Sequence, residues 1–299
     1  MRRAYYVLDV FADQALAGNP LVVVVDSQGL DGARMQKIAG EFNLSETVFV
    51  SDPRDPVNTA SLRIFTPGRE LPFAGHPTIG TAILLAHLRA RDILHGQDVR
   101  VVLEEKVGEV VCVARHRRGA AMAAYFHLPK LPESLGAAPE REALAADLGI
   151  EASEIGFPGH EPALFGAGTP NLFVPVKSLA TLASVRPGRK IWGADGGPCV
   201  YLYTNEVVEK GSHFHARMFA PGWGVSEDPA TGSAAAAFAG VLMAFEPPGD
   251  GETMFVIEQG YEMGRPSKIS LGLKVEKGRL HDATVGGSAR ILCEGTIDI

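Results

Sequence analysis

Short apolar and alternating segments dominate the chain, and glycine and proline separate them along most of its length. Such segments are typical of strands, because successive side chains of a strand point to opposite faces of a sheet. The sequence therefore predicts many strands and few helices. The expected strands are residues 4–11, 21–25, 43–50, 60–66, 99–104, 108–116, 121–129, 166–176, 198–204, 213–219, 253–258, 268–275 and 279–292.

Four segments carry a helical pattern instead. Residues 31–42 place apolar side chains at near-helical spacing, and Asp31 is a preferred capping residue at their start. A short helix is expected over residues 140–150. The helices expected over 76–90 and 228–244 differ from these two, because apolar residues cover them on nearly all sides. A helix without a polar face must be enclosed by other parts of the protein.

The two apolar helices belong to a repeat. Residues 63–86 read RIFTPGRELPFAGHPTIGTAILLA, and residues 217–244 read RMFAPGWGVSEDPATGSAAAAFAGVLMA. In both copies Arg-x-Phe-x-Pro-Gly precedes a loop, then His-Pro or Asp-Pro, and then the apolar run. Likewise, GNP before LVVVV recurs as GTP before NLFVPV. A repeat of about 150 residues in a chain of 299 predicts two structurally similar halves.

The predicted fold follows from this duplication. Many strands and one enclosed helix in each half favour a curved sheet wrapped around that helix. The fold class is therefore α+β, with two pseudo-symmetric domains, each a mixed β-sheet barrel around a central buried helix. Residues 129–140 are rich in proline and alanine and mark the boundary. We expect domains at 1–127 and 128–289, and the last strand, about 290–299, is a candidate addition to the first.

Composition and charge exclude several classes of function. The chain has a net charge of −7 and no block of basic residues, which argues against nucleic acid or an anionic membrane as partner. Its longest apolar run is shorter than the roughly 20 residues of a membrane span. Three widely spaced cysteines do not form a disulfide or zinc framework. Without a recognisable signal peptide, we expect a cytoplasmic protein.

The starts of the two enclosed helices are the candidate site. A helix N-terminus presents unpaired N–H groups and a partial positive charge, so it binds carboxylate or phosphate. If the halves are related by a pseudo-two-fold axis, both helix starts face one cleft. No nucleotide-binding motif is present, which favours a small-molecule carboxylate as the ligand. Gly75 and Gly232 would donate backbone N–H groups to it.

Glu46 is the candidate acid/base. It lies among apolar residues of an expected strand, where loss of solvation raises the pKa of a carboxyl group. A raised pKa suits proton transfer to and from carbon near neutral pH. The matching strand of the second half carries no carboxylate and has Cys199 near this position. One acid/base would therefore work on one face of the ligand.

Five segments carry a resemblance to a known family: DVFADQALAGNPLVVV, NLSETVFV, TPGRELPFAGHPTIGTA, SEDPATGSA and QGYEMGRPSKI. They span nearly the whole chain, and together they resemble the phenazine-biosynthesis (PhzF-like) isomerase family, which shares the fold of diaminopimelate epimerase. The resemblance implies an isomerase without cofactor or metal, similar to trans-2,3-dihydro-3-hydroxyanthranilate isomerase. It implies that Glu46 moves the proton and that His76, Asp228 and Ser233 bind and polarise the substrate.

Two further functions stay open. Epimerases of the wider fold use a cysteine at each helix start, and this chain has none there. A two-base epimerase or racemase of an amino acid would instead pair Glu46 with Asp228 or Cys199. The other alternative is a non-catalytic small-anion binder. The sequence is also compatible with a homodimer.

Several polar residues have a structural interpretation. His76 and Asp228 both stand at helix starts, and Asp228 is expected to cap its helix as well as to bind ligand. Arg63 and Arg217 occupy matching strands and are expected to form ion pairs. His213 and His215 lack a third nearby ligand in the sequence, so a metal site there is disfavoured. The role of Arg265 stays open.

Overall fold

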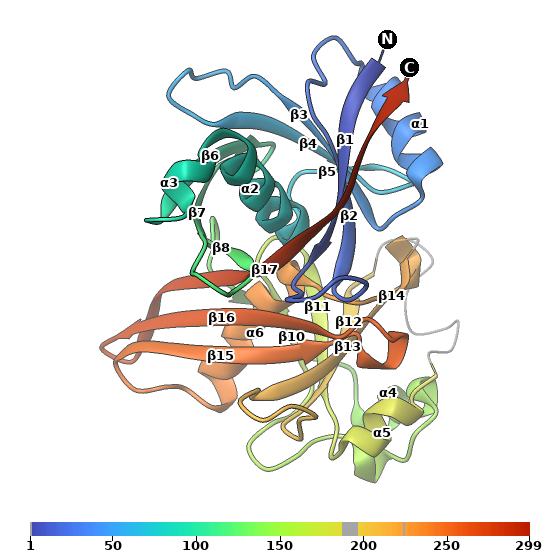
Figure 1. Ribbon diagram of the computed structural model, residues 1–299. Helices are drawn as coiled ribbons and strands as arrows, with labels where there is room; N and C mark the ends of the chain where they lie inside the picture. The colour runs from blue at the N-terminus through green and yellow to red at the C-terminus, as the bar shows by residue number, and fades with distance from the viewer. Residues whose placement is uncertain (1, 187–196, 224) are drawn as a thin grey trace. The chain divides into compact units, whose positions relative to one another are not determined.

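The computed structural model describes residues 2–186, 197–223 and 225–299. It divides into two compact units. Unit 1 consists of Met1–Pro129 and Gly286–Ile299, and unit 2 consists of Lys130–Val285. Figure 1 follows the chain through both.

Unit 1 is a mixed sheet with three helices. Its helices are α1 (Gly32–Phe42), α2 (Gly75–Arg89) and α3 (Arg91–Leu94). Its strands are β1 (Arg2–Val10), β2 (Asn19–Val24), β3 (Glu46–Ser51), β4 (Ala60–Phe65), β5 (Glu70–Leu71), β6 (Val99–Glu105), β7 (Gly108–Arg115), β8 (Met122–His127) and the second part of β17 (Arg279–Asp298).

The pairing of these strands closes the sheet on itself. β1 pairs antiparallel with β2, β2 parallel with β3, and β3 antiparallel with β4. β4 pairs parallel with β6, and β6, β7 and β8 follow as antiparallel neighbours. β17 pairs with both β8 and β1 and so completes the ring.

Helix α2 fills the interior of unit 1. It contacts β1, β2, β3, β6, β7 and β8, and Figure 1 shows it beside β6 and β7. Every residue from Gly75 to Ala86 is buried, which agrees with a helix that has no polar face. α1 is different, because only Met35, Ile38 and Ala39 are buried. The carboxylate of Asp31 accepts a hydrogen bond from Arg34 N at 2.7 Å, so Asp31 caps α1 as predicted.

Unit 2 contains a second mixed sheet and the second enclosed helix. Its helices are α4 (Arg141–Leu148), α5 (Leu179–Ser184) and α6 (Gly232–Phe245), with short 3₁₀ turns η1 (Ala152–Glu154), η2 (Pro221–Trp223) and η3 (Tyr261–Met263). Its strands are β9 (Glu133–Ser134), β10 (Ala163–Gly166), β11 (Pro170–Pro175), β12 (Cys199–Thr204), β13 (Phe214–Ala220), β14 (Val225–Asp228), β15 (Gly251–Gln259), β16 (Ser267–Glu276) and the first part of β17.

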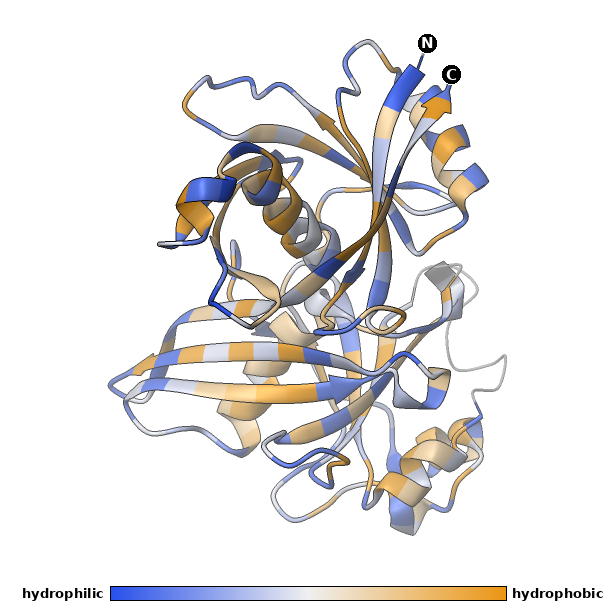
Figure 2. Ribbon diagram, in the orientation of Figure 1, coloured by the Kyte–Doolittle hydropathy of each residue, from blue (hydrophilic) through white to orange (hydrophobic). Residues whose placement is uncertain are grey.

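The two units repeat one topology. β10, β11, β12 and β13 pair as β1, β2, β3 and β4 do: antiparallel, parallel, antiparallel. β13 then pairs antiparallel with β14 and parallel with β15, as β4 does with β5 and β6. α6 contacts β10, β11 and β16 and is apolar along its length, as Figure 2 shows. The predicted fold class, two matching sheets each around one buried helix, is confirmed.

β17 is divided between the two units, whereas β9 lies within unit 2. β9 follows β8 in the chain but pairs with β10 of unit 2. β17 begins in unit 2 and ends in unit 1 against β1. The first strand of each repeat therefore pairs with the segment that continues the other repeat.

The starts of the two enclosed helices differ from the prediction. α2 begins at Gly75, one residue before the expected start at His76. α6 begins at Gly232, because Asp228 is still paired with Met218 as the last residue of β14. Thr231 is the N-cap, so the expected capping role of Asp228 is wrong.

Candidate active site

Glu46 and His76 meet at the start of α2. Glu46 is the first residue of β3 and lies opposite Leu21 of β2. Oε2 of Glu46 lies 3.4 Å from Nε2 of His76, in the first turn of α2. The side chain of Glu46 is 15% exposed and that of His76 is 4% exposed. A carboxylate within reach of solvent thus lies against a buried imidazole.

The environment of His76 keeps its imidazole neutral. Burial lowers its pKa to about 3, against a smaller opposite effect of the Pro20 carbonyl. Nδ2 of Asn19 lies 3.3 Å from Nδ1 of His76, and Asn19 is fully buried. Nε2 of the same ring faces Glu46. His76 is therefore a neutral imidazole at neutral pH and not a cation.

Thr78 connects the same helix turn to a buried carboxyl group. Its Oγ1 lies 2.8 Å from the carbonyl oxygen of Ala74 and 2.7 Å from Oε1 of Glu105. One hydroxyl hydrogen serves only one acceptor at a time. Burial raises the pKa of Glu105 to about 8, more than the hydrogen bond with Thr78 lowers it. The hydroxyl of Thr78 thus lies between two acceptors, Oε1 of Glu105 and the carbonyl oxygen of Ala74, and Glu105 is largely protonated at neutral pH.

The start of α6 has a different arrangement. Oγ1 of Thr231 donates to Oδ2 of Asp228 at 2.6 Å. Gln259 donates through Nε2 to the carbonyl oxygen of Asp228 at 2.7 Å and accepts from Thr231 N at 3.2 Å. Asp228 and Thr231 are buried. This bracing holds the segment 228–231 ahead of the helix.

The first turn of α6 offers backbone donors. The first i→i−4 bond at this end runs from Ala235 N to the carbonyl oxygen of Thr231 at 3.0 Å. The amides of Gly232, Ser233 and the next residue precede that bond, so the helix does not use them. Gly232 is buried, whereas Ser233 is only partly buried. In unit 1 the corresponding predicted donor, Gly75, is the buried first residue of α2.

Cys199 occupies the position in unit 2 that Glu46 occupies in unit 1. Glu46 starts β3 and pairs with Leu21 of the parallel neighbour β2. Cys199 starts β12 and pairs with Asn171 of the parallel neighbour β11. Cys199 is buried, with 4% of its surface exposed. The sheet register therefore assigns the two residues to equivalent positions.

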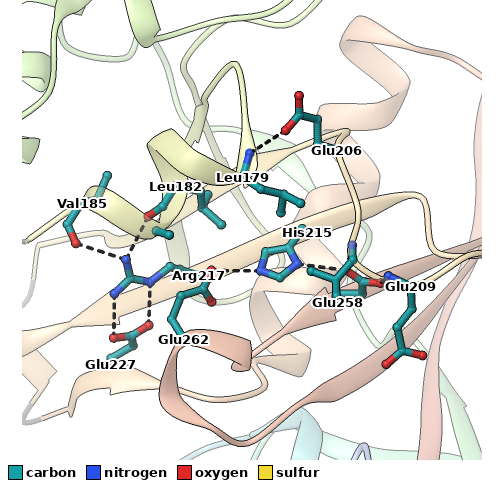
Figure 3. Close-up of polar contacts among 12 residues, drawn as sticks. Leu179, Leu182, Val185, Glu206, Glu209, His215, Arg217, Glu227, Glu258 and Glu262 are labelled. Atoms are coloured by element: carbon teal, nitrogen blue, oxygen red, sulfur yellow. Dashed lines mark hydrogen bonds and ion pairs between the residues drawn. The ribbon is translucent and has the colours of Figure 1, made fainter.

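The matching arginines form matching ion pairs, as predicted. Nε of Arg63 lies 2.7 Å from Oε1 of Glu70, and Nε of Arg217 lies 2.8 Å from Oε1 of Glu227. Each arginine also donates a second hydrogen bond to its glutamate. Figure 3 shows Arg217 donating in addition to carbonyl oxygens of α5 and the residue after it. These pairs brace β4 to β5 and β13 to β14.

His215 is part of a buried network in unit 2. Its Nδ1 lies 2.9 Å from Oε2 of Glu258 and its Nε2 lies 3.1 Å from Oε1 of Glu262, as Figure 3 shows. Burial opposes protonation of His215, but the two carboxylates together raise its pKa above the ordinary value. His213 instead accepts from Val256 N at 3.0 Å. His215 thus connects β13 to β15 and η3, and His213 is hydrogen-bonded to β15.

Neither a metal-ligand cluster nor a membrane-spanning helix is found among the residues that the structure describes. Among them, no three histidine, cysteine or carboxylate side chains are grouped as metal ligands. Nor does any described helix combine the length and apolar character of a membrane span.

Arg265 closes the turn after β15 through its backbone, with Arg265 N donating to the carbonyl oxygen of Gly260 at 2.9 Å.

Comparison with known proteins identifies the family. The model of the phenazine biosynthesis-like protein family matches residues 8–295. The chain belongs to this family.

An uncharacterized isomerase of Mesorhizobium japonicum is 47% identical to this chain over 99% of both chains. The trans-2,3-dihydro-3-hydroxyanthranilate isomerase of Pseudomonas aeruginosa is 36% identical, covering 97% of this chain and 98% of its own. A PhzF-family phenazine biosynthesis protein of Bacillus anthracis matches with a TM-score of 0.88 and 25% identity over 100% of both chains.

This PhzF-family chain is an enzyme, an isomerase of the PhzF type. The alternative of a non-catalytic anion binder is therefore not retained. The individual roles of Glu46, His76, Asp228 and Ser233 stay predictions.

Sequence reasoning missed the residues that support the site in this PhzF-family isomerase. Asn19, Thr78 and Glu105 in unit 1 and Gln259 in unit 2 were not singled out. Asn19 stands in the repeated Gly-x-Pro turn and Thr78 in the GHPT segment, so the repeat itself contained a signal for both. Glu105 and Gln259 lie at the ends of β6 and β15, which are equivalent strands. Only the sheet topology reveals that equivalence.

Proposed function

We propose that this isomerase moves a proton between two carbon atoms of a small carboxylate and shifts a double bond, with Glu46 as the acid/base. One observation carries the proposal: the carboxylate of Glu46 lies 3.4 Å from the buried, neutral imidazole of His76 at the start of an enclosed helix. The protonated carboxyl and the carboxylate of Glu46 then alternate within one turnover.

The proposed step is balanced without an oxidant or reductant. The carboxylate of Glu46 removes a proton from one carbon, and the electron pair of that C–H bond becomes part of a new double bond. The former double bond supplies electrons to a second carbon, which takes the proton back from Glu46. The substrate and product therefore differ only in the positions of one hydrogen and one double bond.

His76 is proposed to hold Glu46 and to polarise the substrate. A neutral imidazole that donates from Nε2 stabilises a carboxylate without adding a full positive charge. It therefore stabilises the ionised form of Glu46 less than an imidazolium would, which leaves the carboxylate basic enough to remove a proton from carbon. Its buried position beside Asn19 fixes the direction of the ring.

The substrate is proposed to be trans-2,3-dihydro-3-hydroxyanthranilate or a similar small carboxylate. The 36% identical relative that is named for this substrate supports the proposal. Asp228, Gly232, Ser233 and Gly75 stay proposed substrate-binding residues. The braced carboxylate of Asp228 suits an amino or hydroxyl group, and amides at a helix start suit a carboxylate.

The test is isomerisation of trans-2,3-dihydro-3-hydroxyanthranilate in D₂O, followed by NMR. The wild-type protein is expected to convert the compound and to place deuterium at one carbon. Glu46→Gln keeps the shape of the side chain but removes the base, so turnover is expected to fall by about three orders of magnitude or more. Its melting temperature should stay near that of the wild type.

Glu41→Gln is the matched control, because Glu41 is an exposed residue of α1. It should convert substrate at the wild-type rate. If Glu46→Gln retains turnover, Glu46 is not the acid/base. If the wild type converts no compound in a panel of small carboxylates, the proposed substrate class is wrong.

A two-base epimerase is the second candidate, and the equivalence of Cys199 and Glu46 in the sheet register favours it. Removal and return of a proton on opposite faces of one carbon needs two bases. In that case an amino acid would exchange its α-proton for deuterium in both epimers, and Cys199→Ser would abolish exchange from one of them. Single-face exchange that is unaffected by Cys199→Ser would exclude this candidate.

A further inference from the structure

A pocket of about 310 Å³ lies in unit 1, apart from the residues assigned to catalysis. It forms where the ends of α2 and α3 meet the turn between β7 and β8 and the second part of β17. None of the residues that line it is a predicted site residue. Its polar lining consists of His87, Arg91, His95, His116 and Arg290.

The polar lining is cationic. All of the lining residues belong to the part of the chain that the structure describes. Two arginines and three histidines contribute, and no lining residue is acidic. Burial and then the positive charges of Arg91, His116 and His95 lower the pKa of His87. Repulsion among these positive charges therefore opposes protonation of His87. A bound anion would relieve that repulsion.

Acidic residues lie near the lining but are not part of it: Asp9 lies opposite Arg290 in the pairing of β1 with β17, and Asp92 follows Arg91 in α3. The carboxylate of Asp98 lies 3.6 Å from the guanidinium of Arg115. Nε of Arg290 donates to the carbonyl oxygen of Asp13 at 2.7 Å, a neutral acceptor that positions the guanidinium without cancelling its charge.

His95 and His116 face one another across the pocket wall. Their Nδ1 atoms lie 3.1 Å apart and their ring centroids 4.9 Å apart. Two ring nitrogens at that distance share one proton, because one nitrogen must donate and the other accept. A second proton on the pair would place two like charges in contact.

The remainder of the lining is apolar. Leu94 and Ala289 are buried, and Met122 and Ile291 are partly buried. An inorganic ion would leave this surface without a partner. A molecule with a carboxylate at one end and a small apolar body would match both parts of the lining, and the guanidinium of Arg91 recognises carboxylate through paired donors.

We propose that this pocket binds a small organic carboxylate with an apolar body, of the aromatic-acid type, at a site separate from Glu46. The cationic lining holds the carboxylate, and the apolar lining holds the ring. Binding should strengthen as the pH falls, since a bound anion favours protonation of His87, which adds positive charge.

Benzoate is the probe, and the histidine Cε1–H signals in ¹H–¹³C NMR spectra are the measurement. The signals of His95 and His116 are assigned from His95→Asn and His116→Asn. Benzoate is expected to shift both signals saturably and to bind more tightly at pH 6 than at pH 8. Arg91→Gln should weaken binding about tenfold, the loss of one charge-assisted contact, without changing the isomerase activity. Arg91 is exposed, so this variant is expected to fold.

Arg100→Gln is the matched control, because Arg100 is an exposed arginine of β6 outside the pocket. It should bind benzoate as the wild type does. Equal affinity of Arg91→Gln and wild type would overturn the proposal, and so would equal binding of benzyl alcohol, which lacks the charge. Inorganic phosphate that binds as tightly as benzoate would overturn the requirement for an apolar body. None of these outcomes depends on Glu46, so they leave the proposed function unaffected.

Discussion

Two consecutive glutamates in β6 show how strongly the surroundings of a side chain change its pKa. Glu104 and Glu105 point to opposite faces of the strand. Backbone N–H groups of Asp55 and Arg54, with the side-chain amide of Asn58, lower the pKa of Glu104 to about 2. Burial raises the pKa of Glu105 to about 8. Composition cannot distinguish the two, because the difference lies in their partners.

Glu105 should make stability depend on pH. Its pKa in the folded state, about 8, lies above the ordinary value of 4.5. The unfolded chain therefore releases this proton first, and the contribution of Glu105 falls as the pH rises from about 4.5 to about 8. Glu105→Gln mimics the protonated acid, so it should be more stable than the wild type across that range. At pH 8 its free energy of unfolding should be higher by on the order of a few kcal/mol. Urea unfolding at pH 5 and pH 8 measures this difference.

Glu104→Gln is the matched comparison for that experiment. It replaces an ionised carboxylate that accepts backbone hydrogen bonds, so it should destabilise the protein at pH 8 and do so less as the pH approaches 2. A Glu105→Gln variant whose stability follows the pH in parallel with the wild type would show that Glu105 is ionised in the folded protein.

At the scale of elements, the enclosed helices were the most predictable parts of the fold. Their apolar surface on all sides leaves burial as the only stable arrangement in water. Their starts were less predictable. His76 lies in the first turn of α2, whereas the matching Asp228 precedes α6, because pairing with Met218 and contacts with Gln259 keep it extended. These partners are remote in sequence, so a local pattern does not contain them.

A pair of helix glycines tests how tightly α2 is enclosed. A Cβ atom on Gly80 would lie 2.6 Å from Leu21 Cδ2 and 2.7 Å from Val10 Cγ2, and both neighbours are fully buried. Gly80→Ala should therefore destabilise the protein by about 1–3 kcal/mol through overpacking. Gly40 of α1 is exposed, and its nearest neighbour would be the Pro67 carbonyl oxygen at 4.0 Å.

Gly40→Ala is consequently expected to stabilise the protein by up to about 1 kcal/mol, because alanine favours helix more than glycine does. The two variants are compared by their free energies of unfolding in urea. Equal and positive gains from both substitutions would mean that α2 has space around Gly80 and that the enclosure is looser than the structure indicates.

At the scale of the whole molecule, β17 links the stability of unit 1 to the end of the chain. Its second part pairs with β1 from Arg2↔Asp298 to Val10↔Ala289. It belongs to unit 1 although it is continuous with a strand of unit 2. The contribution of this strand to unit 1 therefore comes from residues far away in sequence.

A chain that ends at Val285 should lose the fold of unit 1 but keep that of unit 2. Without its partner, β1 has an open edge and the ring of strands is interrupted. Amide hydrogen exchange followed by mass spectrometry is expected to show loss of protection in β1, β2 and α2, with protection retained in β15 and β16. A chain that lacks only Asp298 and Ile299 is the control and should lose little. Full protection of β1 in the shorter chain would contradict this expectation.

The sequence by itself determined the duplication, the strand-rich architecture and the two enclosed helices, because these follow from periodic apolar patterns that each segment carries on its own. Glu46 and His76 were also chosen from the sequence, through the repeat and the resemblance. Their contact depends on the pairing of Leu21 with Glu46 and on the enclosure of α2, which bring together residues far apart in the chain. The same is true of Asn19 beside His76 and of Glu105 beside Thr78. Only the tertiary structure decided these three contacts, because a side chain acquires its charge state and hydrogen-bond partners from neighbours that the fold supplies.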